Sequence, residues 1–151
     1  MSKVIIVYES KWGNTRQVAE TIGEGIKENQ ESEVNVQELG DIDIDKVSEY
    51  DVILIGSPNH MGGPTRGIKK FIEKLGKLGL EGKRAAVFDT SFTRDYEKAI
   101  KRMEFDILKK ASGLQLIQPG LSVIVNGTKG PLADGELDKC RDYGIKLGAR
   151  I

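Results

Sequence analysis

Apolar and polar positions follow two periods along the chain, one typical of strands and one typical of helices. Short runs that are apolar throughout, such as "VIIVY" and "VILIG", predict strands buried on both faces. Between them, apolar residues recur every three or four positions, so that Val18, Ile22 and Ile26 share one face of a predicted helix. Strands are predicted at 4–8, 34–39, 52–56 and 84–88, with a last one in 114–125 that Pro119-Gly120 breaks. Helices are predicted at 14–27, 65–75, 96–111 and 136–147.

This alternation predicts an α/β fold. At 151 residues the chain has the size of one domain, which we expect to span residues 1–151. Fully apolar strands need helices on both faces, which gives a three-layer sandwich around a parallel sheet with right-handed crossovers. Ligands of such sheets bind beyond the carboxyl ends of the strands, where the strand order reverses. The loops that follow Tyr8, Gly56 and Phe88 are therefore the candidate binding loops.

The first loop, "SKWGNT" at residues 10–15, has the composition of an anion site. The first turn of the helix that follows presents unpaired N–H groups and partial positive charge. Gly13 allows close approach of the backbone, and Ser10, Asn14 and Thr15 can donate hydrogen bonds. Because neither G-x-G-x-x-G after a strand nor G-x-x-x-x-G-K-[ST] occurs, a single phosphate fits better than a longer one. The alternative is plain N-capping by Ser10 or Asn14.

The second loop, "GSPNHMGG" at residues 56–63, is long for a connection between a strand and a helix. Asn59, His60 and Met61 have no amphipathic pattern that would bury them. The pair Gly62-Gly63 can adopt dihedral angles closed to other residues. We predict that this loop borders a ligand, and the alternative is a simple turn rich in glycine and proline. For His60 we favour a side chain exposed to solvent, and the alternative is a side chain that contacts the ligand.

The third loop places Thr90 and Ser91 at a strand end and Phe92 in a polar setting. Phe92 is predicted to border the same ligand, and the alternative is that it packs sideways into the protein. Three such loops, with one phosphate cradle and apolar flanks, would suit a flat aromatic ring that carries a phosphate tail.

Composition narrows the function classes further. Lys+Arg and Asp+Glu both number 23, and a formal net charge of zero gives no support to nucleic-acid binding. The segment "MSKVIIVYES" resembles neither a secretory signal nor a membrane span. One cysteine, Cys140, permits neither an intramolecular disulfide nor a zinc cluster, and we expect it to be inert packing. We therefore expect a cytoplasmic protein without a metal site.

Four segments resemble the short-chain flavodoxins. "ESKWGNTRQVAETI" is similar to the phosphate loop of that family, a hydroxyl residue followed by T-G-N-T and a helix. "GSPNHMGGPTRGIKKFIEKL" looks like the loop that lies against the flavin, with Met61-Gly62 in place of a Met-Gly pair. "FTRDYEKAIKRM" resembles the segment whose aromatic residue stacks on the flavin, which points to Phe92, and "NGTKGPLADGELDKCRDYGIKLG" resembles the family's carboxyl end. The resemblance implies a five-stranded sheet in the order 2-1-3-4-5, for which flavodoxin is itself the standard example.

The family implies reversible binding of FMN and carriage of single electrons between redox partner proteins, with no catalytic residue. The partners would be a reductase or a ferredoxin-like protein, and the chain a monomer or a weak homodimer. The residues predicted to contact FMN are Ser10, Lys11, Trp12, Gly13, Asn14, Thr15, Ser57, Pro58, Asn59, His60, Met61, Gly62, Gly63, Thr90, Ser91 and Phe92.

Three departures from the family pattern bear on this interpretation. Lys11-Trp12 replaces the usual small residues, and the third loop is shorter and lacks the common Gly-Asp element. Familiar flavodoxins are also strongly acidic, whereas this chain is neutral. We predict that its cations steer an acidic or neutral partner, and the alternative is ordinary solvated helix faces. The cations concerned are Arg66, Lys69, Lys70, Lys74, Arg94 and Lys98.

Two alternatives to an electron carrier stay open at this point. One is a flavodoxin-like reductase that takes hydride from NAD(P)H and reduces quinones; such enzymes often have longer loops and dimerise over the flavin. The other is a binding module that kept the fold and lost FMN. A response-regulator receiver needs an aspartate cluster where this chain has Glu9-Ser10 and Gly56-Ser57, and it is set aside.

Overall fold

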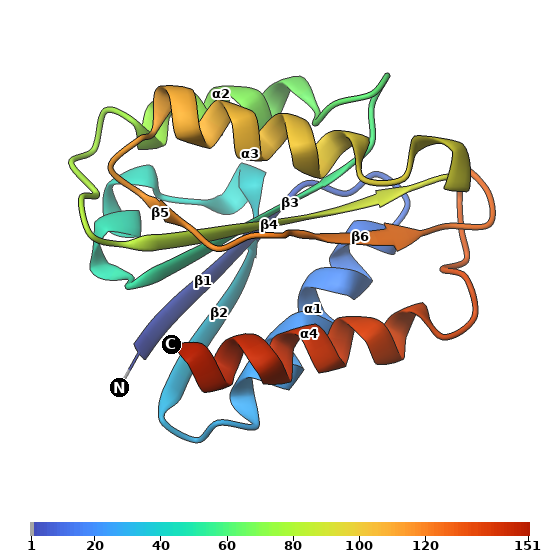
Figure 1. The fold of residues 1–151 in the computed structure, drawn as a ribbon, viewed down its shortest axis with the longest axis horizontal. Coiled ribbons are helices and arrows are strands. Elements are labelled where there is room, and N and C mark those ends of the chain that lie inside the picture. The colour runs from blue at the N-terminus through green and yellow to red at the C-terminus, as the bar shows by residue number, and fades with distance from the viewer. Residues whose placement is uncertain (1) are drawn as a thin grey trace.

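A parallel sheet divides the protein into three layers in this computed structural model, which describes residues 2–151. The strands are β1 (Ser2–Tyr8), β2 (Ser32–Glu38), β3 (Val52–Pro58), β4 (Arg84–Ser91), β5 (Gln115–Leu116) and β6 (Leu121–Ile124). The helices are α1 (Asn14–Lys27), α2 (Arg66–Leu75), α3 (Lys98–Lys110) and α4 (Glu136–Arg150). Short 3-10 turns are η1 (Leu39–Asp41), η2 (Ile44–Glu49) and η3 (Thr93–Asp95). Figure 1 shows α2 and α3 on one face of the sheet and α1 and α4 on the other.

The sheet confirms the expected flavodoxin-like order. Its strands run β2-β1-β3-β4-β5, all parallel, and β6 also pairs with β4. The break predicted at Pro119-Gly120 separates β5 from β6. Pro119 has no N–H to donate to β4, and the N–H of Gly120 instead donates to Glu104 Oε2 on α3 at 2.9 Å. The fifth strand is therefore interrupted because its backbone bonds to a helix there.

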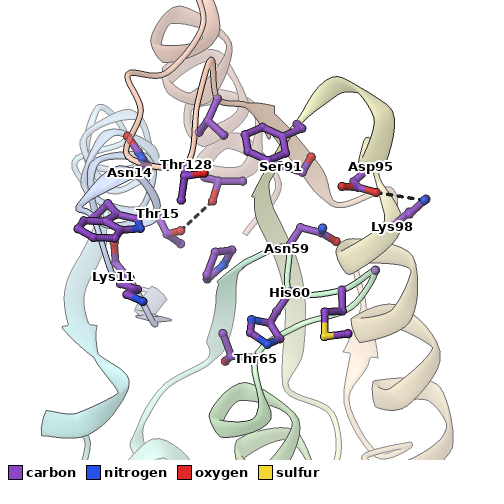
Figure 2. Close-up of a pocket in the computed structure, with 18 of the residues that line it drawn as sticks. Lys11, Asn14, Thr15, Asn59, His60, Thr65, Ser91, Asp95, Lys98 and Thr128 are labelled. Carbon is purple, nitrogen blue, oxygen red and sulfur yellow. Dashed lines mark hydrogen bonds and ion pairs between the residues drawn. The ribbon is translucent and has the colours of Figure 1, made fainter.

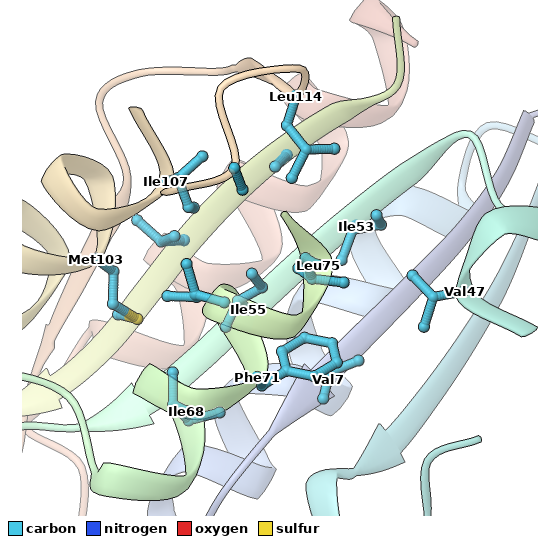
Figure 3. Packing of buried hydrophobic residues seen from close by; sticks show 14 of the residues in the cluster. Val7, Val47, Ile53, Ile55, Ile68, Phe71, Leu75, Met103, Ile107 and Leu114 are labelled. Atoms are coloured by element: carbon cyan, nitrogen blue, oxygen red, sulfur yellow. The ribbon is translucent and has the colours of Figure 1, made fainter. Parts of the chain in front are cut away.

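Two hydrophobic clusters account for strands that are apolar along their whole length. In β1, Ile5 and Val7 face the cluster beneath α2 and α3, whereas Val4 and Ile6 face the cluster beneath α1 and α4. Figure 3 shows the first of these clusters. The predicted helix faces are confirmed: Val18, Ala19, Ile22 and Ile26 of α1, and Ile68, Phe71, Ile72 and Leu75 of α2, are all buried.

Helix α3 begins at Lys98, two residues later than the sequence predicts. Glu97 has a left-handed backbone with φ of 67°, and its N–H donates to Ser122 Oγ on β6 at 3.0 Å. The start of this helix is therefore set by a contact 25 residues away in the sequence, which no local pattern reveals. Helix α4 ends at Arg150, three residues beyond its expected end at 147.

The pairing register brings the three candidate loops to one edge of the sheet. Tyr8 lies opposite Gly56 on the neighbouring strand, and Gly56 lies opposite Phe88 on the next. The chain therefore leaves β1, β3 and β4 at nearly the same level, which builds a common site from loops far apart in the sequence.

Candidate functional site

A cavity of about 720 Å³ lies at this edge of the sheet, between the three candidate loops and a fourth segment at 125–128. Its volume falls within the roughly 300–1,000 Å³ typical of sites for cofactors and small molecules. Figure 2 shows Asn14, Thr15 and Thr128 on one side and Asn59 and His60 on another. The candidate residues that line it are Ser10, Lys11, Trp12, Asn14, Thr15, Pro58, Asn59, His60, Met61, Gly62, Thr90, Ser91 and Phe92.

Three candidate residues lie outside the lining. Gly13 is the N-cap of α1, with a left-handed φ of 92°. Ser57 is fully buried; its hydroxyl donates to the carbonyl of Pro58 at 2.8 Å and accepts the N–H of Thr65 at 3.0 Å. Gly63 is buried behind His60, with which it pairs. These residues shape the loops, and their contact with FMN stays a prediction.

The first loop leaves the amino end of α1 open to the cavity. No side chain caps this helix, so the alternative of N-capping by Ser10 or Asn14 is wrong. Ser10 Oγ instead accepts the N–H of Gly13 at 3.0 Å, which leaves its own hydroxyl hydrogen free to donate. Within residues 2–151, the first-turn N–H groups of Asn14 and Thr15 have no acceptor among the hydrogen bonds of the structure. Such groups suit a bound anion.

A buried hydrogen bond joins the first loop to the third. The hydroxyls of Thr15 and Thr90 lie 2.9 Å apart, and both residues are almost completely buried. Figure 2 shows this bond as a dashed line at the wall of the cavity. One hydroxyl of the pair donates to the other, so Thr15 holds the loops together in addition to bordering the cavity.

The second loop ends in a tight hairpin turn. His60 and Gly63 exchange backbone hydrogen bonds of 2.7 and 3.2 Å around Met61 and Gly62. Met61 has φ of 54° and Gly62 has φ of 83°, and two positive values define a type I′ turn. The unusual angles therefore fall on Met61 and Gly62, whereas Gly63 has an ordinary φ. His60 is exposed, and Met61 projects with 95% of its surface exposed.

Polar atoms without a partner point to a ligand in the cavity. Ser91 is 3% exposed, and its hydroxyl has no hydrogen-bond partner in the described chain. The side-chain oxygen of Asn59 is buried and equally without a partner. Buried polar atoms are almost always hydrogen-bonded in folded proteins. Both residues line the cavity, where a bound molecule would supply the missing bonds.

Phe92 is half-buried and forms part of the cavity wall. The guanidinium of Arg94 lies 5.3 Å from the centre of its ring. The ring therefore borders the cavity, as the sequence predicts for a residue beside the ligand.

Six residues outside the predicted contact set also line the cavity; two of them, Arg94 and Lys98, are predicted from sequence only as cations that steer a partner. Thr65 caps α2 by accepting the N–H of Ile68, and it donates its hydroxyl to Glu9. A threonine directly before an amphipathic run is a recognisable capping signal. The other five come from the turn η3, from the first residue of α3 and from the fourth segment. The six residues are Thr65, Arg94, Asp95, Lys98, Val125 and Thr128.

The fourth segment closes the side of the cavity next to the first loop. The N–H of Val125 donates to the carbonyl of Ser91 at 2.9 Å. Lys129 Nζ lies 4.9 Å from the centre of the Trp12 ring, and Lys11 Nζ lies 5.3 Å from it. Trp12 is 45% exposed and therefore lies at the rim of the cavity, with its ring between these two cations.

Cations outnumber acids in the lining of the cavity. Lys11, Arg94 and Lys98 face a single carboxylate, Asp95. Asp95 lies 3.1 Å from Lys98 Nζ and 3.7 Å from Arg94 Nε. The excess of positive charge favours an anionic ligand.

A buried carboxyl group supports the third loop from behind. Asp89 on β4 accepts hydrogen bonds from the N–H of Ile100 at 3.0 Å and from Ser122 Oγ at 2.6 Å. Burial raises the pKa of Asp89 to about 6, although these bonds act in the opposite direction. Asp89 thus ties α3 and β6 to the strand that carries Thr90 and Ser91.

Two further expectations concern metals and membranes. Over residues 2–151, no group of three or more His, Cys, Asp or Glu side chains is placed to hold a metal ion. Cys140 is buried, and burial raises the pKa of its thiol to about 12, in keeping with an inert packing role. The same part of the chain contains no helix that is both long and apolar enough to span a bilayer.

Comparison with known proteins identifies the class of protein. The family model described as a flavodoxin domain matches residues 5–124. The chain belongs to this flavodoxin family. A solved flavodoxin from the domain Archaea shares 26% identity and superposes with a TM-score of 0.83, over 98% of this chain and 97% of that one.

Curated relatives include both flavodoxins and quinone reductases. The flavodoxin of Clostridium saccharobutylicum is 35% identical over 89 residues, which is 59% of this chain and 56% of that protein. An NAD(P)H dehydrogenase (quinone) of Chromohalobacter salexigens is 25% identical over 114 residues, or 62% of this chain and 57% of that protein. The matches thus span little more than half the length of these relatives.

Proposed function

We propose that the chain binds FMN in this cavity and carries single electrons between redox proteins. The observation that carries the proposal is the open amino end of α1 beside buried polar atoms that lack partners. A phosphate would accept hydrogen bonds from the first-turn N–H groups and from the hydroxyl of Ser10. A ring system with carbonyl and N–H groups would meet Ser91 and Asn59. The residues present therefore fit FMN.

The remaining residues would hold and shield the flavin. Trp12 and Phe92 border the cavity with aromatic faces, and Met61 projects at its edge. Such groups exclude water and stack on a flat ring. FMN itself supplies the redox chemistry when bound. Electron transfer needs no nucleophile or general base, which suits a site whose lining is mostly hydroxyl, amide and apolar groups.

The phosphate cradle is tested by comparing FMN with riboflavin, which lacks the phosphate. Charge-assisted hydrogen bonds contribute about 1.5–3 kcal/mol each, so we expect FMN to bind at least about a hundredfold more tightly. Fluorescence titration of the apoprotein measures both dissociation constants. Ser10→Ala should weaken FMN severalfold and leave riboflavin unchanged, whereas the exposed control Ser48→Ala should change neither. Equal affinity for FMN and riboflavin would contradict the proposed cradle.

A quinone reductase is the second candidate, because one relative named NAD(P)H dehydrogenase (quinone) matches over 62% of the chain. It predicts steady consumption of NAD(P)H in the presence of a quinone and of bound FMN. The carrier predicts no turnover with these two substrates alone, since its electrons come from and go to proteins. We also propose a cytoplasmic location, which the single buried cysteine supports.

A further inference from the structure

Helix α3 has an unusual solvent face, which we call the α3 face. Its exposed residues are Lys98, Lys101, Arg102, Phe105, Leu108, Lys109 and Lys110. Every one of them is basic or apolar. The two acidic residues of the helix, Glu104 and Asp106, are both buried. The face therefore presents five cations around two large apolar side chains, in a chain whose formal net charge is zero. Three of these cations have an acidic neighbour: Lys98 lies 3.1 Å from Asp95, Lys101 lies 3.8 Å from Glu97 and Arg102 lies 3.3 Å from Asp106.

The charge of the neighbouring elements strengthens this asymmetry. Helix α2 lies beside α3 on the same side of the sheet (Figure 1) and exposes four cations and one acid. That acid, Glu73, is paired with Lys110 at 3.0 Å. The balancing negative charge lies elsewhere, because residues 28–51 hold nine acidic residues and only one lysine. The zero net charge of the chain thus conceals a group of cations on α2 and α3 and a group of acids in segment 28–51, whose turns η1 and η2 pack against the same hydrophobic cluster as these helices.

The apolar pair at the centre of the face is strongly exposed. Phe105 is 53% exposed and Leu108 is 56% exposed. They are three residues apart in the helix and so lie next to each other. Arg102 and Lys109 hold their charged groups 5.8 and 5.6 Å from the centre of the Phe105 ring. An apolar centre inside a charged rim is the usual composition of a protein–protein interface.

The α3 face is continuous with the candidate site. Lys98, the first residue of α3, lines the cavity. Phe105 follows seven residues later, about 10 Å along the helix axis at 1.5 Å per residue. A protein seated on this face would therefore reach the rim of the cavity.

We propose that the α3 face docks an electron-transfer protein whose own contact surface is acidic around an apolar centre. The occupant follows from complementarity: the lysines and Arg102 attract carboxylates, and Phe105 and Leu108 need an apolar counterpart that a phosphate backbone does not offer. This inference rests on the proposed function, because docking beside the cavity brings a partner close to the flavin only if FMN binds there. Binding of the partner to the α3 face can be measured without any electron transfer.

The probe for this proposal is a purified acidic bacterial ferredoxin, titrated into the FMN-loaded protein by calorimetry. Lys101→Glu/Lys109→Glu reverses two exposed charges, and Phe105→Ser removes the apolar centre. We expect dissociation constants about tenfold higher for the charge variant and about fivefold higher for Phe105→Ser. Raising the salt from about 20 to 500 mM should weaken wild-type binding by about tenfold or more.

Matched controls lie on the opposite side of the sheet. Lys146→Glu reverses an exposed charge on α4, and Ile145→Ser removes a side chain of α4 that is 38% exposed. Both should bind the ferredoxin as the wild type does. The proposal is overturned if the α3 variants bind normally, or if the α4 controls lose as much affinity.

Other occupants would reveal themselves in the same series. Self-association in sedimentation that the α3 variants abolish would instead identify a second copy, docked through its acidic segment 28–51. Binding to phosphatidylserine vesicles or to duplex DNA, with no binding of the ferredoxin, would likewise overturn the proposal. The flavin fluorescence of each sample shows whether FMN is bound, and this separates the docking proposal from the proposed function. Normal FMN binding without docking refutes the partner alone, and docking without FMN binding refutes the proposed function alone.

Discussion

Asp89 joins three elements through one buried side chain. Its carboxyl is fully buried on β4 and is bonded to the first turn of α3 and to β6. Burial raises its pKa from 3.8 to about 6, because the charged form loses its hydration. The folded state therefore favours the protonated form. The stability that this group contributes is greatest below about pH 4 and is lost as the pH rises through 6.

We predict that Asp89→Asn changes how stability depends on pH. Asparagine cannot ionise. Its single side-chain oxygen can still accept the N–H of Ile100, and its NH2 group can donate to Ser122 Oγ in place of the bond that the carboxylate accepts. A pKa shift of this size corresponds to about 3 kcal/mol. As the pH rises from 4 to 7, the free energy of unfolding of the variant should therefore increase relative to that of the wild type by up to about 3 kcal/mol. Urea unfolding at several pH values measures the difference. Asp142→Asn, which removes an exposed carboxyl from α4, is the control for charge alone. A difference that stays constant with pH would refute the role assigned to Asp89.

At the scale of elements, the hairpin of the second loop stores conformational strain. Met61 adopts a left-handed backbone, which costs a residue with a Cβ roughly 1–2 kcal/mol, and its exposed side chain gains little packing in return. Asn-Gly is the preferred pair for a type I′ turn. The strain falls on a residue at the edge of the cavity, where the proposed flavin would lie.

Met61→Asn should raise the free energy of unfolding of the apoprotein by about 0.5–1 kcal/mol, since asparagine accepts the left-handed conformation. Thermal or urea unfolding measures the effect. Met61→Ala removes the same side chain and keeps the strain, so its stability should stay near that of the wild type. If both variants behave alike, backbone strain at Met61 is not the cause.

Helices α1 and α4 cross at closely packed glycines. A Cβ on Gly144 would lie 2.2 Å from the carbonyl oxygen of Ile22, a backbone atom that cannot move aside alone. On Gly148 of the same helix, the nearest atom would be the Ile26 carbonyl oxygen at 3.1 Å. The close packing of α1 against α4 therefore depends more on the missing side chain at Gly144 than on the one at Gly148.

We expect Gly144→Ala to lower the free energy of unfolding by about 1–3 kcal/mol, because overpacking outweighs the better helix propensity of alanine. Gly148→Ala serves as the matched comparison and should cost clearly less. If urea unfolding shows that Gly144→Ala costs no more free energy of unfolding than Gly148→Ala, the close approach of the Ile22 carbonyl does not limit the packing of these helices.

At the scale of the whole molecule, local patterns reveal the layers but not all of the site. The buried faces of α1 and α2 follow from their helical period alone, and the break in the last strand follows from Pro119-Gly120. The strand order comes from resemblance to a family. Most loop residues that line the cavity are visible in sequence, because hydroxyl and glycine residues at strand ends carry a recognisable signal.

What the sequence hides depends on contacts between distant segments. Thr128 enters the cavity because segment 125–128 folds back against the first loop, and the contact of Lys129 with Trp12 spans more than a hundred residues. The first turn of α3 starts where it does because of Ser122. The positive α3 face is equally invisible in the net charge, since it depends on which residues of the helix are buried.

The most direct test of the central claim is an anaerobic titration of the apoprotein with FMN, followed by stepwise reduction of the complex. Trp12 is the only tryptophan and lies at the cavity, so both flavin and tryptophan fluorescence should report binding. We predict that the fluorescence of micromolar FMN is quenched at one molecule of FMN per chain and that reduction proceeds in two separate one-electron steps. Absence of quenching at micromolar FMN would contradict the cofactor, and a single two-electron step would contradict the electron carrier.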